Sequence, residues 1–126
     1  MKILIVDDDA VSLTAMNDLL TMDGHIVEHA SNGMGALSML KVMIPDIIVM
    51  DWRMPMIDGR DLIKALRADP KFRKMPILVL TAMCDEDLRD ELNGIRDIAN
   101  PISFLHKPVP IETIKETIHD LSKMSV

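Results

Sequence analysis

The sequence predicts an α/β fold, with a parallel sheet of five strands and helices on both of its faces. Apolar runs of strand length alternate along the chain with segments whose apolar residues recur at helical spacing. Several runs are continuously apolar, as expected for strands that are covered on both sides. No stretch has the composition of a linker, a repeat or a low-complexity tract, so residues 1–126 are expected to form one domain.

Five strands are expected in chain order. The first is the β-branched run Lys2–Val6. The second, His25–Ala30, alternates apolar and polar residues, which is typical of an edge strand. The others are the mostly apolar runs Asp46–Met50, Pro76–Leu80 and Ile102–Leu105.

Five helices are expected to connect and follow these strands, each marked by apolar residues three or four positions apart. They are marked by Leu13, Met16 and Leu20; by Ala36, Leu37, Leu40 and Met43; by Leu62, Ile63 and Leu66; by Leu88, Leu92, Ile95 and Ala99; and by Ile111, Ile114, Ile118 and Leu121. Right-handed crossovers between parallel strands place such helices on both faces of the sheet.

The composition excludes several classes of protein. A net charge of −6 argues against a nucleic-acid surface, which needs a basic patch. No apolar run is long enough to cross a membrane, so no membrane insertion is expected. The N-terminal sequence Met1–Asp9 has acids close behind one lysine and does not resemble a signal peptide. The single Cys84 excludes an internal disulfide, and together these features predict a cytoplasmic protein.

Polar residues follow four of the five expected strands. They are Asp7, Asp8 and Asp9 after the first strand, Asp51 after the third, Thr81 and Ala82 after the fourth, and Lys107 after the fifth. Each has an ordinary alternative explanation, such as a helix cap formed by Asp8 or Asp9. Because the carboxyl ends of parallel strands meet at one edge of a sheet, their coincidence favours a functional site there.

The charges of these residues predict the chemistry of the site. Asp7, Asp8 and Asp51 would repel one another unless a cation joined them or one took up a proton. Oxygen-only ligands favour Mg²⁺, with Asp8 as a direct ligand and Asp7 acting through a bound water. Asp51 ends a central strand alone, so it is predicted to attack phosphorus and form an acyl phosphate. Lys107 and Thr81 are expected to supply an ammonium and a hydroxyl to the phosphoryl oxygens.

Four stretches occur in a fixed order: ILIVDDD, DIIVMDWRMPMIDG, ILVLTA and FLHKP. With this ordered set, the sequence closely resembles a receiver domain of two-component response regulators over its whole length. The resemblance implies a flavodoxin-like, doubly wound sheet of strand order 2-1-3-4-5. It implies that a histidine kinase or histidine phosphotransfer protein phosphorylates Asp51. It also implies that Mg²⁺ is bound by Asp8, Asp51 and the backbone carbonyl of Arg53.

The resemblance further implies how the phosphoryl group is held and reported. Thr81, Ala82 and Lys107 match the residues that contact phosphate, and Thr81 and Phe104 match a pair whose rearrangement follows phosphorylation. A downstream protein target would bind near the helix of Leu88, the strand Ile102–Leu105 and the last helix. Such a domain assists its own phosphorylation and dephosphorylation but is not otherwise expected to be an enzyme.

Two departures from the family pattern stand out. The segment between Thr81 and Lys107 is longer than usual, by about one helical turn, and lacks the usual Ala-Gly-Ala before the last strand. Arg53 and Met83 occupy the positions two residues after Asp51 and Thr81, where bulky side chains are expected to slow the approach of water to an acyl phosphate.

Alternative interpretations concern both the fold and the use of the site. A flavin electron carrier would need a first loop that accepts phosphate, whereas DDDA would repel it. A dehalogenase-type phosphatase would need an acid where Arg53 stands. A degenerate receiver that binds partners without phosphorylation stays open, as does a receiver taken from a larger regulator. The sequence does not predict the kinase, the target or the oligomeric state.

Overall fold

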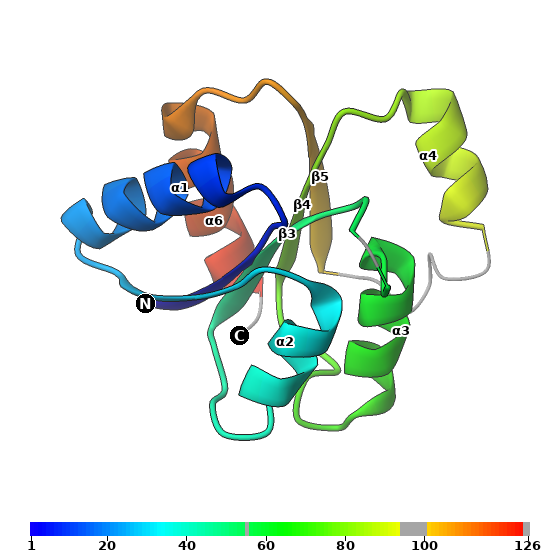
Figure 1. Cartoon of the computed structure of the whole chain (residues 1–126), viewed down its shortest axis with the longest axis horizontal. Helices are drawn as coiled ribbons and strands as arrows, with labels where there is room; N and C mark the ends of the chain where they lie inside the picture. Colours follow the sequence, from blue (N-terminus) through cyan, green and yellow to red (C-terminus); the bar gives the residue numbers. More distant parts are fainter. Residues whose placement is uncertain (55, 94–100, 125–126) are drawn as a thin grey trace.

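The computed structural model describes residues 1–54, 56–93 and 101–124, and Figure 1 shows their arrangement. Five parallel strands form one sheet in the order β2-β1-β3-β4-β5. The strands are β1 (Lys2–Val6), β2 (Ile26–Ala30), β3 (Ile47–Asp51), β4 (Ile77–Thr81) and β5 (Ile102–His106). The predicted fold class, strand order and edge position of the second strand are therefore confirmed.

Helices cover both faces of the sheet. They are α1 (Ala10–Met22), α2 (Gly33–Met39), α3 (Gly59–Ala68), α4 (Asp85–Glu91) and α6 (Ile111–Met124). Helices α1 and α6 pack on one face, and α2 and α3 pack on the other, which α4 extends beyond α3 (Figure 1). Within the described ranges, no helix combines the length and apolar character that crossing a membrane requires.

Two apolar layers enclose the central strands. Ile47 and Val49 of β3 join the layer under α1 and α6, whereas Ile48 and Met50 join the layer under the other helices. This alternation explains why the central strands are continuously apolar in sequence. A fully buried aliphatic side chain contributes about 1.5–3 kcal/mol, so these strands form a rigid base for whatever follows them.

The register of β1 against β3 is fixed by hydrogen bonds at the start of both strands. The backbone N–H of Lys2 donates to Asp46 Oδ2 over 2.7 Å, and the backbone N–H of Asp46 donates to the carbonyl of Lys2 over 2.7 Å. From this point the pairing runs to Val6 and Met50. Asp7, which follows β1, and Asp51, the last residue of β3, therefore lie at the same edge of the sheet.

Side-chain caps fix the first three helices. Asp9, Asn32 and Asp58 are the N-caps of α1, α2 and α3, and each accepts a hydrogen bond from a backbone N–H in the first turn. Such a cap contributes about 0.5–2 kcal/mol. Cys84 is the N-cap of α4 and makes no side-chain capping bond.

The second helix is shorter than its apolar spacing predicts. It ends at Met39, with Leu40 as the C-cap, and Met43 lies beyond it in the turn that leads to β3. Pro45 keeps a helix from continuing through Ile44, because a proline disfavours helical backbone at the preceding residue.

The fourth helix is also shorter than predicted. A helix over Leu88–Ala99 was expected, but α4 ends at Glu91, with Leu92 as its C-cap. Asn93 follows and begins an Asn-Gly pair, a sequence that favours a turn. The predicted extra helical turn falls on residues 94–100, outside the described residues.

Candidate functional site

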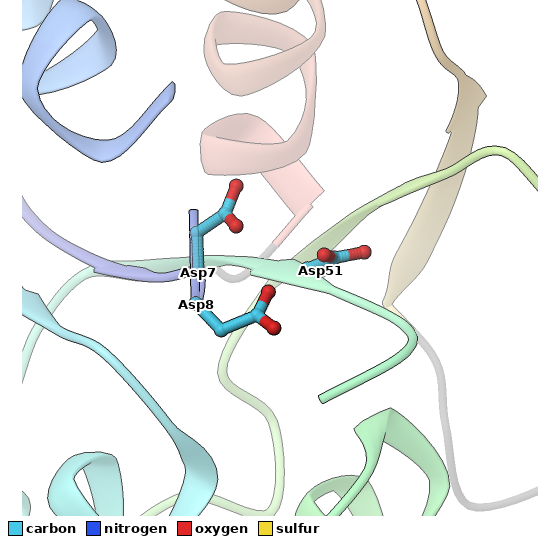
Figure 2. Close-up of side chains that lie close together, drawn as sticks. All are labelled: Asp7, Asp8 and Asp51. Atoms are coloured by element: carbon cyan, nitrogen blue, oxygen red, sulfur yellow. The ribbon is translucent and has the colours of Figure 1, made fainter. Parts of the chain in front are cut away.

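Three carboxylates meet where β1 and β3 end. Asp7, Asp8 and Asp51 each offer one oxygen, and these oxygens all lie within 4.8 Å of one another (Figure 2). The Asp7 residue is only 3% exposed, Asp51 is half-buried and Asp8 is exposed. The acids that the sequence placed at one edge are thus brought together.

The third acid of the DDD run is diverted from this group. Asp9 accepts hydrogen bonds from the N–H of Val11 and the hydroxyl of Ser12, each over 3.0 Å. The Ser12 hydroxyl, followed by the Val11 N–H, lowers the pKa of the Asp9 carboxyl. The backbone N–H of Asp9 in turn donates to Asp7 Oδ1 over 2.9 Å, which orients that carboxylate. Asp9 is therefore the helix cap, and Asp7 and Asp8 remain for the site.

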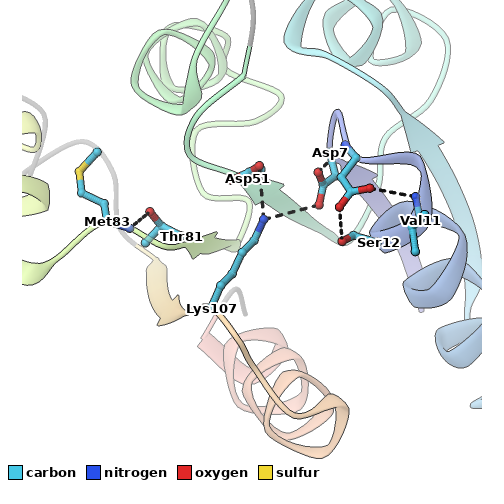
Figure 3. Close-up of polar contacts among 8 residues, drawn as sticks. Asp7, Val11, Ser12, Asp51, Thr81, Met83 and Lys107 are labelled. Carbon is cyan, nitrogen blue, oxygen red and sulfur yellow. Dashed lines mark hydrogen bonds and ion pairs between the residues drawn. The ribbon is translucent and has the colours of Figure 1, made fainter.

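Lys107 brings a cation to the same point from the far side of the sheet. Its Nζ lies 3.4 Å from Asp51 Oδ2 and 3.9 Å from Asp7 Oδ2 (Figure 3). Its backbone N–H donates to the carbonyl of Thr81 over 2.8 Å, which ties the end of β5 to the end of β4. Three carboxylates against one ammonium leave a formal charge of −2 when all are ionised.

This excess of negative charge is reflected in the acidity of Asp51. Burial raises the pKa of the Asp51 carboxyl, and the neighbouring Asp7 and Asp8 raise it further, while Lys107 opposes them. The ionised group is therefore less favourable here than in water, and a cation binding beside it would relieve the cost.

The site offers the ligands that a hard divalent cation needs. Asp7, Asp8 and Asp51 supply only oxygen atoms, which Mg²⁺ prefers over nitrogen and sulfur. The incomplete charge balance by Lys107 leaves room for a further cation in electrostatic terms. The residues present therefore fit the predicted metal.

A cavity of about 340 Å³ opens beside Asp51. It is lined by Asp51, Arg53, Thr81, Ala82, Met83, Asp87 and Lys107. Most of these residues were predicted for the site, whereas Asp87 was not. Its carboxylate adds an acidic group to the lining of the cavity.

Thr81 is buried at this cavity with its hydroxyl engaged elsewhere. Thr81 Oγ1 accepts a hydrogen bond from the backbone N–H of Met83 over 3.0 Å. In Figure 3 the hydroxyl points toward Met83 and not toward Asp51 or Lys107. A phosphate-contacting role for Thr81 would therefore require its side chain to turn.

Phe104 lies on the face of the sheet toward which Thr81 points. Its register partner is Val79, two residues before Thr81 on β4, so all three share one face. The Phe104 ring packs edge-on against Trp52, with ring centroids 5.9 Å apart and planes at 68°. Phe104, one member of the predicted switch pair, thus contacts the residue that follows Asp51.

Glu91 on α4 was not predicted for the site. Its carboxylate accepts a hydrogen bond from Trp52 Nε1 and forms an ion pair with Arg53, whose Nη2 lies 2.7 Å from Glu91 Oε1. Glu91 is 38 residues from Arg53 along the chain, and no local pattern indicates such a partner. Only the side-chain contacts between α4 and the residues after β3 reveal it.

Comparison with known proteins agrees with this fold. Residues 3–119 match the family described as response regulator receiver domain. The chain is 36% identical over 119 residues to the chemotaxis protein CheY-3 of Vibrio cholerae, covering 94% of this chain and 88% of that protein.

Two solved structures have the same architecture. CheY4 of Vibrio cholerae matches with a TM-score of 0.85 at 28% identity, covering 95% of this chain and 97% of that chain. The receiver domain of a signal transduction histidine kinase from Syntrophus aciditrophicus matches with a TM-score of 0.85 at 28% identity, covering 97% and 89%. The chain therefore belongs to the response regulator receiver domain family of two-component signalling.

Proposed function

We propose that this receiver accepts a phosphoryl group on Asp51 from the phosphohistidine of a histidine kinase or a histidine phosphotransfer protein. The observation that carries the proposal is the position of Lys107 Nζ, 3.4 Å from Asp51 Oδ2, beside two further carboxylates. An ammonium at this distance is placed to meet oxygens that become attached to Asp51.

Asp8, Asp51 and the backbone carbonyl of Arg53 would hold Mg²⁺ directly, and Asp7 would act through a water. When bound, the metal supplies the positive charge that lets an anionic phosphoryl group approach the carboxylates. The acidic triad, of the kind found in receiver metal sites, supports this assignment.

The chain's own residues then perform the transfer. An Asp51 oxygen forms the bond to phosphorus as the bond from phosphorus to the donor's imidazole nitrogen breaks. Lys107 exchanges its contact with Asp51 for contact with the phosphoryl oxygens. Thr81 turns from Met83 and donates its hydroxyl to another of these oxygens, and Ala82 lines the same cavity.

The turning of Thr81 links phosphorylation to the surface. It vacates the space on the sheet face that Thr81 shares with Phe104, so Phe104 can move inward. The acyl phosphate thereby shifts the population toward one arrangement of α4, β5 and α6, which a downstream protein recognises. An output by protein binding agrees with the net charge of −6, which disfavours direct binding to DNA. The proposal includes a cytoplasmic location, because the exposed Cys84 thiol is free and would stay reduced there.

The acceptor assignment is tested with acetyl phosphate and Mg²⁺, followed by intact-mass measurement. Wild type is expected to gain the mass of one phosphoryl group, Asp51→Asn to gain none, and the exposed-acid control Asp18→Asn to behave as wild type. Incorporation that persists in Asp51→Asn would contradict the acceptor assignment. A wild type that takes up no phosphoryl group and no beryllofluoride would favour the degenerate receiver instead.

A further inference from the structure

One carboxylate on α4 binds both of the side chains that follow Asp51. Glu91 accepts the Trp52 indole N–H with one oxygen and pairs with the Arg53 guanidinium through the other. The two contacts tie the loop after β3 to the last residue of α4.

The ion pair between Glu91 and Arg53 matters because Arg53 lines the cavity beside Asp51. A guanidinium binds phosphate well through charge-assisted hydrogen bonds, so an unrestrained Arg53 would be drawn to a phosphoryl group on Asp51. Instead, its Nη2 lies 2.7 Å from Glu91 Oε1, and its side chain is 67% exposed. Lys107 is then the cation that contacts Asp51 among the described residues.

We propose that Glu91 is a positioning residue that holds the Arg53 guanidinium at α4, so that Glu91 and the phosphoryl group compete for it. The inference rests on the proposed function, because the competitor is the phosphoryl group on Asp51. Its consequence is that phosphorylation weakens the tie between the β3–α3 loop and α4. The end of α4 keeps a separate attachment, since Arg60 Nη2 donates to the carbonyl of Asn93 over 3.1 Å.

Trp52 supplies a built-in reporter of this tie. Its ring is fully buried, its N–H donates to Glu91 and its edge packs against Phe104. The indole N–H therefore senses the charge of its acceptor directly, without any ligand present. A glutamine at position 91 could still accept this hydrogen bond while lacking the charge that holds Arg53.

The test compares Glu91→Gln, Arg53→Ala, the double variant and Glu86→Gln. Glu86 is an exposed acid on the same helix, so the last variant removes the same charge without touching the tie. Trp52 fluorescence is titrated with beryllofluoride, which mimics a phosphoryl group on Asp51, in the presence of Mg²⁺. Glu91→Gln is expected to bind it about two- to fivefold more tightly, as suits an exposed ion pair released to a competitor.

The gain in beryllofluoride affinity that Glu91→Gln produces must depend on Arg53. The double variant is expected to match Arg53→Ala, and Glu86→Gln to match wild type. In ligand-free protein, the indole N–H resonance of Trp52 is expected to move in Glu91→Gln and to stay in place in Glu86→Gln. Together these results would establish Glu91 as the residue that positions Arg53.

Other results separate the inference from the function it rests on. An equal gain in Glu86→Gln, or a gain that survives in the double variant, would overturn the positioning role while leaving phosphorylation of Asp51 intact. An unmoved indole resonance in Glu91→Gln would also overturn it. A wild type without any beryllofluoride response would contradict the proposed function and, with it, the competition.

Discussion

The ammonium nitrogen of Lys107 lies 3.4 Å from Oδ2 of Asp51. Lys107 follows β5 and Asp51 ends β3, so the contact spans the intervening strand β4. The same nitrogen lies 3.9 Å from Asp7 Oδ2, so one cation is shared by the two more buried acids of the site. Lys107 opposes the rise in the pKa of Asp51 that burial and the neighbouring carboxylates cause. This arrangement makes Lys107 the residue whose loss affects the site most directly.

We expect Lys107→Met to slow phosphorylation from acetyl phosphate by about 10- to 100-fold, the loss typical of a hydrogen bond to a charged group. Without the ammonium, the phosphoryl oxygens lose a donor, and the Asp51 carboxyl is left with its repulsive neighbours. Initial rates of phosphoprotein formation measure the effect. Lys64→Met, on the exposed face of α3, serves as the control. An equal rate for wild type and Lys107→Met would exclude a role in transfer.

Asp51→Asn is expected to stabilise the metal-free protein near neutral pH, on the order of 1 kcal/mol. The pKa of Asp51 is raised in the folded protein, chiefly by burial, so the folded state binds this proton more tightly than the unfolded chain does. The stability it contributes is present below the unfolded pKa, about 3.9, and is lost as the pH rises through the folded pKa. The asparagine variant avoids that loss.

Urea unfolding at a series of pH values checks this prediction. The advantage of Asp51→Asn should be full near pH 7, shrink as the acidity increases, and vanish below about pH 4. Addition of Mg²⁺ should narrow the advantage at neutral pH, because the cation stabilises the wild-type site. If Asp51→Asn and wild type were equally stable at all pH values, the ionised Asp51 carboxylate would not destabilise the folded protein.

Thr81→Ala should separate phosphorylation from its readout. The change removes the oxygen that accepts the Met83 N–H, at a cost of about 1 kcal/mol in the free energy of unfolding. The acceptor Asp51 is untouched, so phosphoryl incorporation should persist at a reduced rate. The beryllofluoride-induced change in Trp52 fluorescence should be lost, whereas Thr81→Ser should retain it. A full fluorescence change in Thr81→Ala would argue against the Thr81–Phe104 switch.

Met83→Ala should shorten the lifetime of the acyl phosphate more than Arg53→Ala does. Both side chains line the cavity, but Arg53 is directed to Glu91 and largely exposed, whereas Met83 is half-buried at the site. Removing the methionine opens a path for water to the phosphorus. Loss of the phosphoryl mass with time gives the lifetimes, and identical decay in wild type and both variants would refute shielding by these residues.

The sequence predicted the sheet and the acid group because both follow from local patterns. Continuous apolar runs indicated buried parallel strands, and the ends of such strands must share an edge. That rule placed Asp51 and Lys107 together although 56 residues separate them, counting from 51 to 107. The roles of acceptor and metal ligand were inferred from charge and strand position and are also implied by the family resemblance, and they stay predictions.

The features that the sequence missed depend on contacts between distant elements. Glu91 looked like one more acid on a polar helix, since nothing nearby marks it as the acceptor for Trp52. The ambiguity between Asp8 and Asp9 as helix cap was settled only by side-chain geometry, with Ser12 completing the cap. Apolar spacing alone predicted that α2 would reach Met43, whereas the helix ends at Met39.

The paired hydrogen bonds between Lys2 and Asp46 lie at the opposite edge of the sheet from the acids. Side chains alternate along a strand, so a one-residue slip of β3 would turn Asp51 onto the wrong face. The hydrogen bonds at the N-terminal ends of β1 and β3 thus help to set how Asp7 and Asp51 align at the C-terminal ends of these strands. Substitutions in the loops around the acids should therefore leave the alignment of β1 and β3, and with it the positions of Asp7 and Asp51 along the sheet edge, in place.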